Sequence, residues 1–136
     1  MSNNGTFEEV AALVRQTLAL SDDEPITSEQ LCFYDLSFTS MDLLDLLFRV
    51  EQRFQIRIPE GTIYGLARGE MDDAEFAEDA VLTAAGRKRL MALLYDSPPQ
   101  LFPERIHVTT LPRYCTVGAI VRLVEHKLKE REACSN

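Results

Sequence analysis

Residues 35–60 read DLSFTSMDLLDLLFRVEQRFQIRIPE, and this stretch decides the fold. Thr39 stands three positions before Asp42, the arrangement of a capping box, so a helix is predicted to begin beside Ser40. Pro59 and Gly61 are predicted to end it after a short extended piece, residues 56–58. Apolar side chains recur along the helix at i, i+3, i+4, i+7 and i+11, as a continuous stripe: Leu43, Leu46, Leu47, Val50 and Phe54.

The same spacing occurs in two other segments of the chain. The first contains Phe7, Val10, Ala11, Val14 and Leu18, and the last contains Val117, Ile120, Val121, Val124 and Leu128. Each stripe needs a partner to bury it, so three stripes in a small chain predict an all-α helical bundle. Thr116 is the predicted cap of the last helix. Cations suit the negative end of its dipole, where the sequence has Lys127, Lys129 and Arg131.

The segments between these helices are less regular. Residues 21–38 form a predicted loop, long enough to expect a function for it. Residues 70–79 carry many acidic side chains and are expected to be a solvated surface with at most a short helix. Residues 82–95 are predicted to be helical with Thr83 as cap, although Gly86 weakens a helix by about 1 kcal/mol relative to alanine. The buried edge of that helix is expected to contain Leu90, Leu93 and Leu94.

Composition limits the functions to be considered. The chain has 136 residues, with 14 Lys and Arg against 22 Asp and Glu, and this net charge of -8 disfavours nucleic acid as a partner. No signal peptide or membrane-spanning run is visible, so a soluble, monomeric, cytoplasmic protein is expected. Cys32, Cys115 and Cys134 lack metal-ligand spacing and are expected to be free thiols in a reducing compartment.

Ser40 is the residue with the greatest chemical interest. On position alone it could simply cap the helix. A helix N-terminus also offers unpaired amides and a positive dipole end, which suit a phosphate ester. An enzyme with a serine nucleophile needs an adjacent base, and the only histidines are His107 and His126, the latter expected to face solvent. No catalytic residues and no metal ligands are therefore predicted, and an enzyme is disfavoured.

The stretch 35–60 resembles the acyl carrier protein family. The family pattern Asp-Leu-Gly-x-Asp-Ser-Leu-Asp, continued to Ile-Pro and an acidic residue, aligns with it without a gap, and residues 116–120 resemble the start of the family's last helix. The resemblance implies that a phosphopantetheinyl transferase attaches 4'-phosphopantetheine from coenzyme A to Ser40. It further implies acyl thioesters carried on that arm for fatty acid, lipid or polyketide-type biosynthesis, with acyl-loading and acyl-processing enzymes such as synthases and acyltransferases as partners.

The sequence departs from the family pattern at three positions. Ser37 replaces the usual glycine, Thr39 replaces the usual aspartate, and Met41 replaces the usual leucine. Methionine for leucine conserves volume and should matter little. Thr39 removes a negative charge beside the modification site, which is expected to weaken recognition by a generic transferase.

A second apolar stripe on the same helix indicates where partners dock. Met41, Leu44 and Phe48 follow i, i+3 and i+7, beside acidic residues that match recognition positions of the family: Asp42, Asp45 and Glu51. The alternative is that Leu44 and Phe48 pack beneath residues 61–111. From Ser40 to Glu60 the sequence contains four acidic residues and three arginines, which gives a net charge of -1. We therefore expect a dedicated partner set rather than partners that need a strongly acidic face.

The whole chain is interpreted as a single carrier domain. Residues 6–60 and 112–131 form its core, and residues 61–111 form an insertion that either covers an unusual acyl chain or adds a docking site. Two alternatives stay open: a carrier-like interaction module without the arm, and an aminoacyl or peptidyl carrier. The Gly-Gly-His/Asp-Ser signature of peptide-synthetase thiolation domains is absent here.

Overall fold

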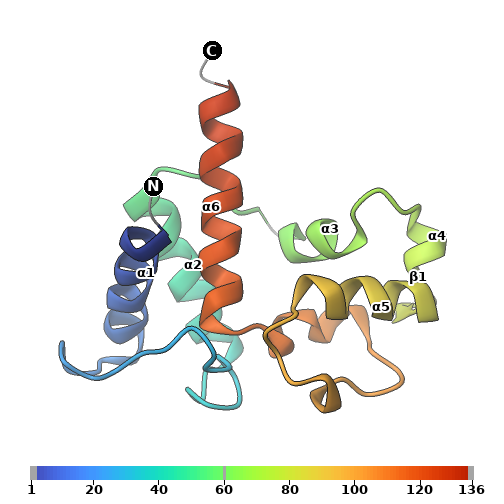
Figure 1. Cartoon of the computed structure of the whole chain (residues 1–136), viewed down its shortest axis with the longest axis horizontal. Helices are drawn as coiled ribbons and strands as arrows, with labels where there is room; N and C mark the ends of the chain where they lie inside the picture. The colour runs from blue at the N-terminus through green and yellow to red at the C-terminus, as the bar shows by residue number, and fades with distance from the viewer. Residues whose placement is uncertain (1–2, 60, 135–136) are drawn as a thin grey trace.

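The computed structural model describes the backbone of residues 3–59 and 61–134, and the side chains of residues 5–59 and 61–132. Glu60, the last residue of the quoted stretch, and the thiol of Cys134 lie outside these ranges. The predicted all-α class is confirmed, because the described residues are mostly helical and the strands are two residues long. Figure 1 shows two groups of elements, one on each side of the last helix, α6.

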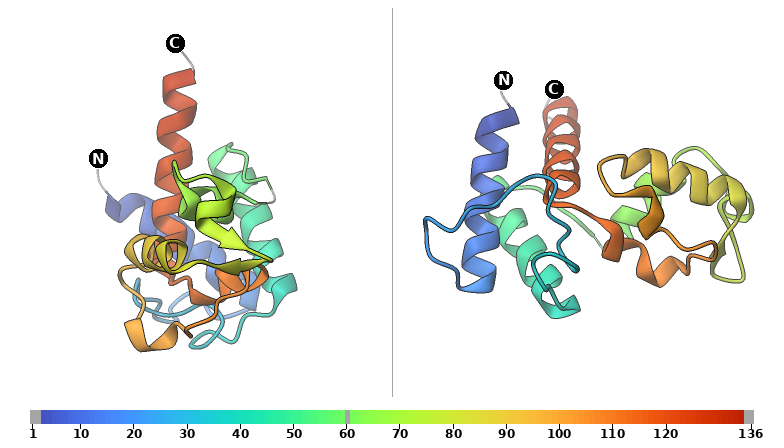
Figure 2. Two further views of the ribbon diagram at one scale, coloured as in Figure 1. Left: turned by 90° about the vertical axis from the view of Figure 1, so that its right-hand side faces the viewer. Right: turned by 60° about the horizontal axis from the view of Figure 1, so that its bottom comes forward.

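The three predicted helices form the bundle on one side of the molecule. They are α1 (Asn3–Leu18), α2 (Ser40–Phe54) and α6 (Val117–Cys134), and α1 and α2 lie together against one side of α6 (Figures 1 and 2). Most of each predicted stripe is buried where the three helices meet; Phe7, Leu18, Leu47, Phe54 and Leu128 are partly buried at its edges. We call this cluster the bundle core. It includes Val10, Val14, Leu43, Leu46, Val50, Val117, Ile120, Val121 and Val124.

The helix α2 ends at Phe54, several residues before Pro59 and Gly61. Gln55 adopts the left-handed conformation, with φ of 58°, and its amide donates to the carbonyl of Glu51 as a C-cap. Arg131 of α6 donates to the carbonyls of Phe54 and Gln55, at 2.6 and 3.1 Å. The Arg131 guanidinium therefore satisfies unpaired carbonyls at the C-terminal end of α2. Pro59 and Gly61 instead precede the next helix.

Residues 61–111 contain more regular structure than their sequence predicts. The elements are α3 (Thr62–Arg68), α4 (Asp73–Phe76), β1 (Ala77–Glu78), β2 (Val81–Leu82), α5 (Ala84–Leu93), and the 3-10 helices η1 (Pro99–Leu101) and η2 (Val108–Tyr114). The short helix allowed for in residues 70–79 is α4, and most side chains of this segment are exposed as expected; Phe76 and the hairpin were not predicted. Phe76 is completely buried, and β1 and β2 pair as an antiparallel hairpin through Asp79 and Ala80, both at positive φ.

These elements enclose a second cluster of buried side chains, the insertion core. Its members are Ala67, Phe76, Leu82, Leu90, Leu94, Phe102, Ile106, Leu111, Tyr114, Cys115 and Ala119. Thr83 caps α5 as predicted, since its Oγ1 accepts from the amide of Gly86 at 2.9 Å. Gly86 permits a close backbone contact, because a Cβ at this position would lie 2.0 Å from the carbonyl oxygen of Phe76. The glycine costs helix propensity but permits α5 to press against the backbone at Phe76. Leu93, expected to be buried, is only partly so.

One polar cluster joins the insertion to the start of α6. The Asp96 carboxylate accepts from the Thr116 hydroxyl at 2.8 Å and pairs with both terminal nitrogens of Arg122, at 3.0 and 3.1 Å. Arg122 also donates to the carbonyl of Leu93. Thr116 caps α6 as predicted, accepting from the amide of Ala119 at 3.0 Å. The cluster ties the end of α5 to the first turns of α6.

Replacing Asp96 tests this connection through its pH dependence. Burial would raise the pKa of Asp96, but hydrogen bonds from Arg122 and Thr116 and the charge of Arg122 outweigh it and hold the pKa below its usual value. The stabilisation is therefore fully present above the unfolded pKa of about 3.9 and is lost as the pH falls through the lower folded value. Asp96→Asn should lower the free energy of unfolding by about 2 kcal/mol at neutral pH, measured by urea denaturation.

The deficit of Asp96→Asn should stay constant from neutral pH down to about pH 4 and shrink below it. The exposed Asp22→Asn is the matched control and should unfold like the wild type at every pH. A deficit for Asp96→Asn that persists unchanged to pH 2 would show that its carboxylate charge contributes nothing to stability.

Candidate functional site

Ser40 is the first residue of α2 and its side chain is exposed. It does not cap the helix. Thr39 does so: its Oγ1 accepts from the amide of Asp42 at 3.1 Å, and the Asp42 carboxylate accepts from the amide of Thr39 at 2.9 Å. The predicted capping box is confirmed, and it leaves the hydroxyl of Ser40 free for other chemistry.

The first turn of α2 also presents backbone donors beside that hydroxyl. Within the described residues, the amides of Ser40 and Met41 have no hydrogen-bond acceptor, because they precede the first intrahelical bond, from Leu43 to the carbonyl of Thr39. Free amides at a helix N-terminus bind a phosphate oxygen well, assisted by the helix dipole. The site therefore fits a phosphodiester attached to the Ser40 oxygen.

The loop that leads to Ser40 is anchored to the start of α6. The Asp35 carboxylate accepts from the amide of Leu31 at 2.7 Å, which closes the turn. Leu31 forms a bridge with Thr116, and the amide of Cys32 donates to the carbonyl of Cys115 at 3.1 Å. The amide of Phe38 then donates to the carbonyl of Cys32 at 3.0 Å, and the Phe38 ring is buried. Sequence patterns carried no signal for this pairing, because it joins segments that are far apart in the chain.

Three substitutions distinguish this loop and helix start from the family pattern, and the backbone explains one of them. Ser37 has φ of 61°, in the left-handed region that glycine enters without penalty. The usual glycine at this position is thus a conformational requirement, and the serine is strained. Thr39 performs the cap that an aspartate would also perform, so the substitution changes charge and leaves the helix start intact.

The second apolar stripe of α2 faces solvent. Met41 is 72% exposed, Leu44 60% and Phe48 59%, among the most exposed large apolar side chains in the described part of the chain. The alternative that Leu44 and Phe48 pack beneath residues 61–111 is therefore wrong. Phe48 borders a shallow groove between α1 and α2. An exposed apolar row beside a modifiable serine is typical of an interaction surface.

The acidic residues beside this row have internal partners. Asp42 belongs to the capping box, and the Glu51 carboxylate accepts from the amide of Ile58 at 2.6 Å, which fixes the extended piece after α2. Asp45 pairs with Arg49 at 3.3 Å, and Arg53 pairs with Glu9 of α1. Two of the three carboxylates thus accept from backbone amides and the third pairs with an arginine, and the exposed apolar row is the distinctive feature of this face.

The remaining reactive groups do not assemble around Ser40. His107 contacts Thr109 and His126 pairs with Glu130, so neither supplies a base hydrogen-bonded to Ser40. Burial raises the pKa of both Cys32 and Cys115 to about 12, which keeps these thiols neutral. In the described side chains no group of three or more His, Cys, Asp or Glu could hold a metal ion, and no helix of the described part could cross a membrane.

Comparison with known proteins shows which family the segment around Ser40 is similar to. Residues 8–68, which include Ser40 and end with α3, match the family model described as "Phosphopantetheine attachment site". A chloroplastic acyl carrier protein of Brassica napus is 32% identical over 77 residues, covering 57% of this chain and 56% of the relative. The chain is similar to acyl carrier proteins over the segment that contains Ser40. The predicted resemblance is thereby confirmed.

Other acyl carrier proteins show the same partial coverage. Acyl carrier protein AcpXL of Brucella melitensis is 36% identical over 56 residues, covering 41% of this chain and 59% of the relative. Acyl carrier protein AcpXL of Rhizobium meliloti is 36% identical over 59 residues, covering 43% and 61%. The chain thus spans roughly three-fifths of the length of these acyl carrier relatives. No solved structure gives a significant match.

The strained serine in the loop provides a test of the local geometry. Ser37→Gly should raise the free energy of unfolding by about 0.5–1 kcal/mol, because glycine relieves the left-handed strain and Ser37 makes no side-chain hydrogen bond within the described residues. Thermal or urea denaturation measures the change. Asp22→Gly, at an exposed position without positive φ, is the control and should destabilise. Equal destabilisation by both substitutions would contradict the strain at Ser37.

Proposed function

We propose that this protein is an acyl carrier that holds 4'-phosphopantetheine on Ser40 and presents acyl thioesters to partner enzymes of fatty acid, lipid or polyketide-type biosynthesis. The observation that carries the proposal is the exposed Ser40 hydroxyl at the start of α2, beside two free amides and inside the segment that matches the attachment-site family. When bound, the arm supplies the thiol that forms the thioester.

The residues of the chain have positioning roles in this function. Thr39 and Asp42 fix the backbone of the first turn of α2, from which the Ser40 side chain projects. The amides of Ser40 and Met41 would hold the phosphate oxygens. Phe38 and the Cys32–Cys115 pairing hold the preceding loop against α6. The protein itself would be non-catalytic, since the chemistry belongs to the arm and to the enzymes that visit it.

Attachment of the arm is tested by intact mass spectrometry. The protein coexpressed with its own transferase should gain the mass of one phosphopantetheinyl group, and Ser40→Ala should gain nothing because the accepting oxygen is gone. Ser37→Ala is the matched control, since that hydroxyl lies three residues away and should leave the modification unchanged. No mass gain in the wild-type protein would instead support the interaction module without an arm.

We further propose that partners dock on Met41, Leu44 and Phe48, with Asp42, Asp45 and Glu51 at the edge of the contact. Exposure of the apolar row supports this, whereas the pairing of Asp45 with Arg49 favours partners that recognise shape and apolar contact over a strongly acidic face. A dedicated partner set follows, because Thr39 and the Asp45–Arg49 pair remove the charge that generic partners use.

Truncation of the row tests the docking proposal. Leu44→Ala and Phe48→Ala should each lower kcat/KM of the transferase or acyl-loading enzyme about tenfold, because exposed anchors contribute to binding. Their thermal unfolding should stay close to that of the wild type, since both side chains are exposed. Gln52→Ala, exposed on the same helix but farther from Ser40, is the control. Unchanged kcat/KM for both truncations would reject this surface.

The broader assignments follow from the same proposal. The chain would act as a monomeric carrier domain with residues 6–60 and 112–131 as its core and 61–111 as an insertion, in the cytoplasm or an equivalent biosynthetic compartment. The separate insertion core supports this division, while Ala119 of that core lies at the beginning of α6, which the two parts share. An aminoacyl or peptidyl cargo on the same arm is the alternative.

A further inference from the structure

A shallow groove between α1 and α2 borders Phe48, the last member of the exposed apolar row. We call it the α1–α2 groove. Leu13 and Phe48 contribute its apolar surface, and the rest of its lining is polar: Gln16, Asp45, Arg49, Gln52 and Arg53. With two arginines and one aspartate, the lining has a net charge of +1 in a chain whose net charge is -8.

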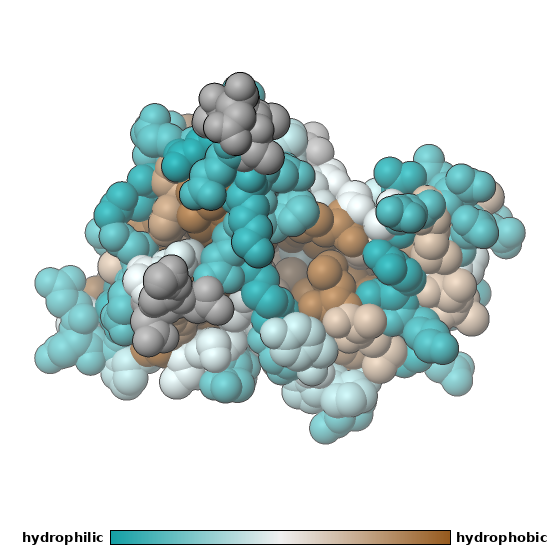
Figure 3. Space-filling model, turned by 45° about the horizontal axis from the view of Figure 1, so that its top comes forward, coloured by the Kyte–Doolittle hydropathy of each residue, from teal (hydrophilic) through white to brown (hydrophobic). Residues whose placement is uncertain are grey.

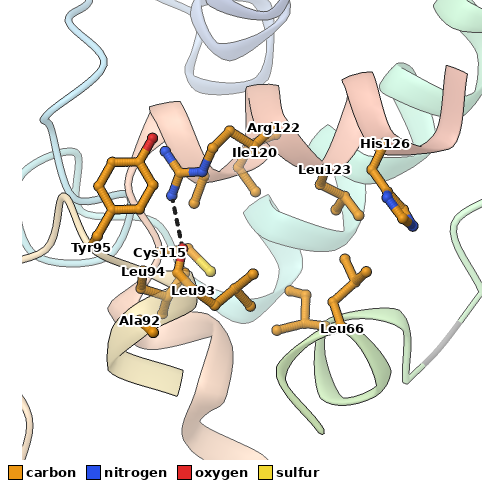
Figure 4. Close-up of a pocket in the computed structure, with 12 residues that line it drawn as sticks. Leu66, Ala92, Leu93, Leu94, Tyr95, Cys115, Ile120, Arg122, Leu123 and His126 are labelled. Atoms are coloured by element: carbon orange, nitrogen blue, oxygen red, sulfur yellow. Dashed lines mark hydrogen bonds between the residues drawn. The ribbon is translucent and has the colours of Figure 1, made fainter. Parts of the chain in front are cut away.

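The groove differs in character from the apolar hollow that lies beside α6, between that helix and the insertion (Figure 3). The side chains that line the hollow are mostly aliphatic. Its arginine, Arg122, is held within the chain, because the guanidinium pairs with Asp96 and donates to the carbonyl of Leu93 (Figure 4). An arginine with such partners has little to offer to a charged group from another protein.

Arg49 in the α1–α2 groove has far weaker partners. Its Nε lies 3.3 Å from the Asp45 carboxylate, but this nitrogen is buried and makes no hydrogen bond. Its Nη1 donates to the side-chain oxygen of Gln16 at 3.5 Å, and its Nη2 makes no hydrogen bond within the described residues. A guanidinium has five N–H donors, so most donors of Arg49 lack an acceptor in the described part of the chain.

Arg53 adds a further donor to the groove. It pairs with Glu9 of α1 through Nε and Nη2, which leaves its Nη1 without a hydrogen bond in the described structure. Glu9 itself does not line the groove. A neutral amide binds a carboxylate more weakly than a guanidinium does, so the two arginines, and not Gln16 or Gln52, determine which groups the groove attracts.

We propose that the α1–α2 groove receives an acidic side chain of the partner enzyme, beside an apolar one that contacts Phe48, an inference that rests on the proposed function. Charge complementarity selects this chemistry, because a carboxylate supplies the acceptors that Arg49 and Arg53 lack and can bind a guanidinium through two hydrogen bonds. The existing pairs with Asp45 and Glu9 hinder it little, since both are solvent-exposed and such pairs contribute little to stability.

The order of charges along α2 sets the direction in which the partner lies. Asp42 and Asp45 precede Phe48, whereas Arg49 and Arg53 follow it. Arg49 is nine positions after Ser40, which is about 14 Å along the helix axis, so one interface of ordinary size spans both. A partner in the reversed direction would place its acidic group against the two aspartates, and like charges in contact oppose binding.

Two model peptides test the sign of the preference. Both are short helices with the same leucine row, flanked in one by glutamates and in the other by lysines. In an NMR titration of the isotope-labelled protein, the glutamate peptide should shift the amides of Leu13, Gln16 and Phe48 and bind about tenfold more tightly than the lysine peptide. The net charge of -8 alone predicts the opposite order. Equal affinities, or tighter binding of the lysine peptide, would overturn the proposal.

Substitution of the arginines locates the preference. Arg49→Gln combined with Arg53→Gln should abolish it, whereas Arg57→Gln should retain it, because Arg57 is exposed beyond the end of α2 and does not line the groove. Thermal unfolding checks that both proteins fold. A preference that survives in the double variant contradicts the assignment. Inorganic phosphate should leave the amides of the groove unshifted; shifts as large as those caused by the glutamate peptide would show a small-anion site instead of a docking site.

The acyl-loading enzyme provides the functional readout. Arg49→Glu combined with Arg53→Glu should lower its kcat/KM about tenfold through KM, with kcat nearly unchanged, because only docking is affected. Arg57→Glu is the matched control. Unchanged kcat/KM in the double charge reversal would reject the groove. The peptide titration needs no arm on Ser40, so absence of the phosphopantetheinyl mass counts against the proposed function, and an armed protein without the glutamate preference counts against the groove alone.

Discussion

The Asp96 carboxylate is the contact on which the arrangement of the two parts depends. It binds the cap of α6 through Thr116 and a side chain nearly two turns later through Arg122. A Cβ on Gly118 would lie 2.8 Å from this carboxylate and 3.1 Å from the carbonyl of Ser28, so the glycine admits both the insertion and the first loop to the same turn. One turn of α6 thereby positions the insertion on one side and the loop before Ser40 on the other.

This shared turn explains why α6 can serve two cores. Val117, Ile120, Leu123 and Val124 belong to the bundle core, whereas Ala119 belongs to the insertion core. A helix that is apolar over more than one stripe must be covered on more than one side. In this chain α1 and α2 cover one side and the insertion covers the other (Figure 2).

Periodic and local features could be predicted from the sequence, and contacts between distant segments could not. Three stripes at helical spacing predicted α1, α2 and α6, and the Thr39–Asp42 box placed the start of α2 correctly because capping is a local interaction. The hairpin at 77–82 was missed, because two-residue strands leave no alternation to detect. Gly86 was interpreted only as a cost to the helix, since its contact with Phe76 exists only after α4 and α5 pack.

At the candidate site, too, local features could be predicted and contacts between distant segments could not. The site combines a fixed helix start with an exposed serine. The row beside Ser40 followed from spacing on α2 and Ser40 itself from the resemblance of residues 35–60, but the anchoring of the loop through Cys32 and Cys115 required the tertiary structure. A serine one position after the cap avoids both roles that would bury its oxygen: it neither closes the helix nor enters the core. Because Thr39 and Asp42 cap the helix, the backbone at Ser40 is fixed while its hydroxyl stays open to the enzymes that would load and unload its arm.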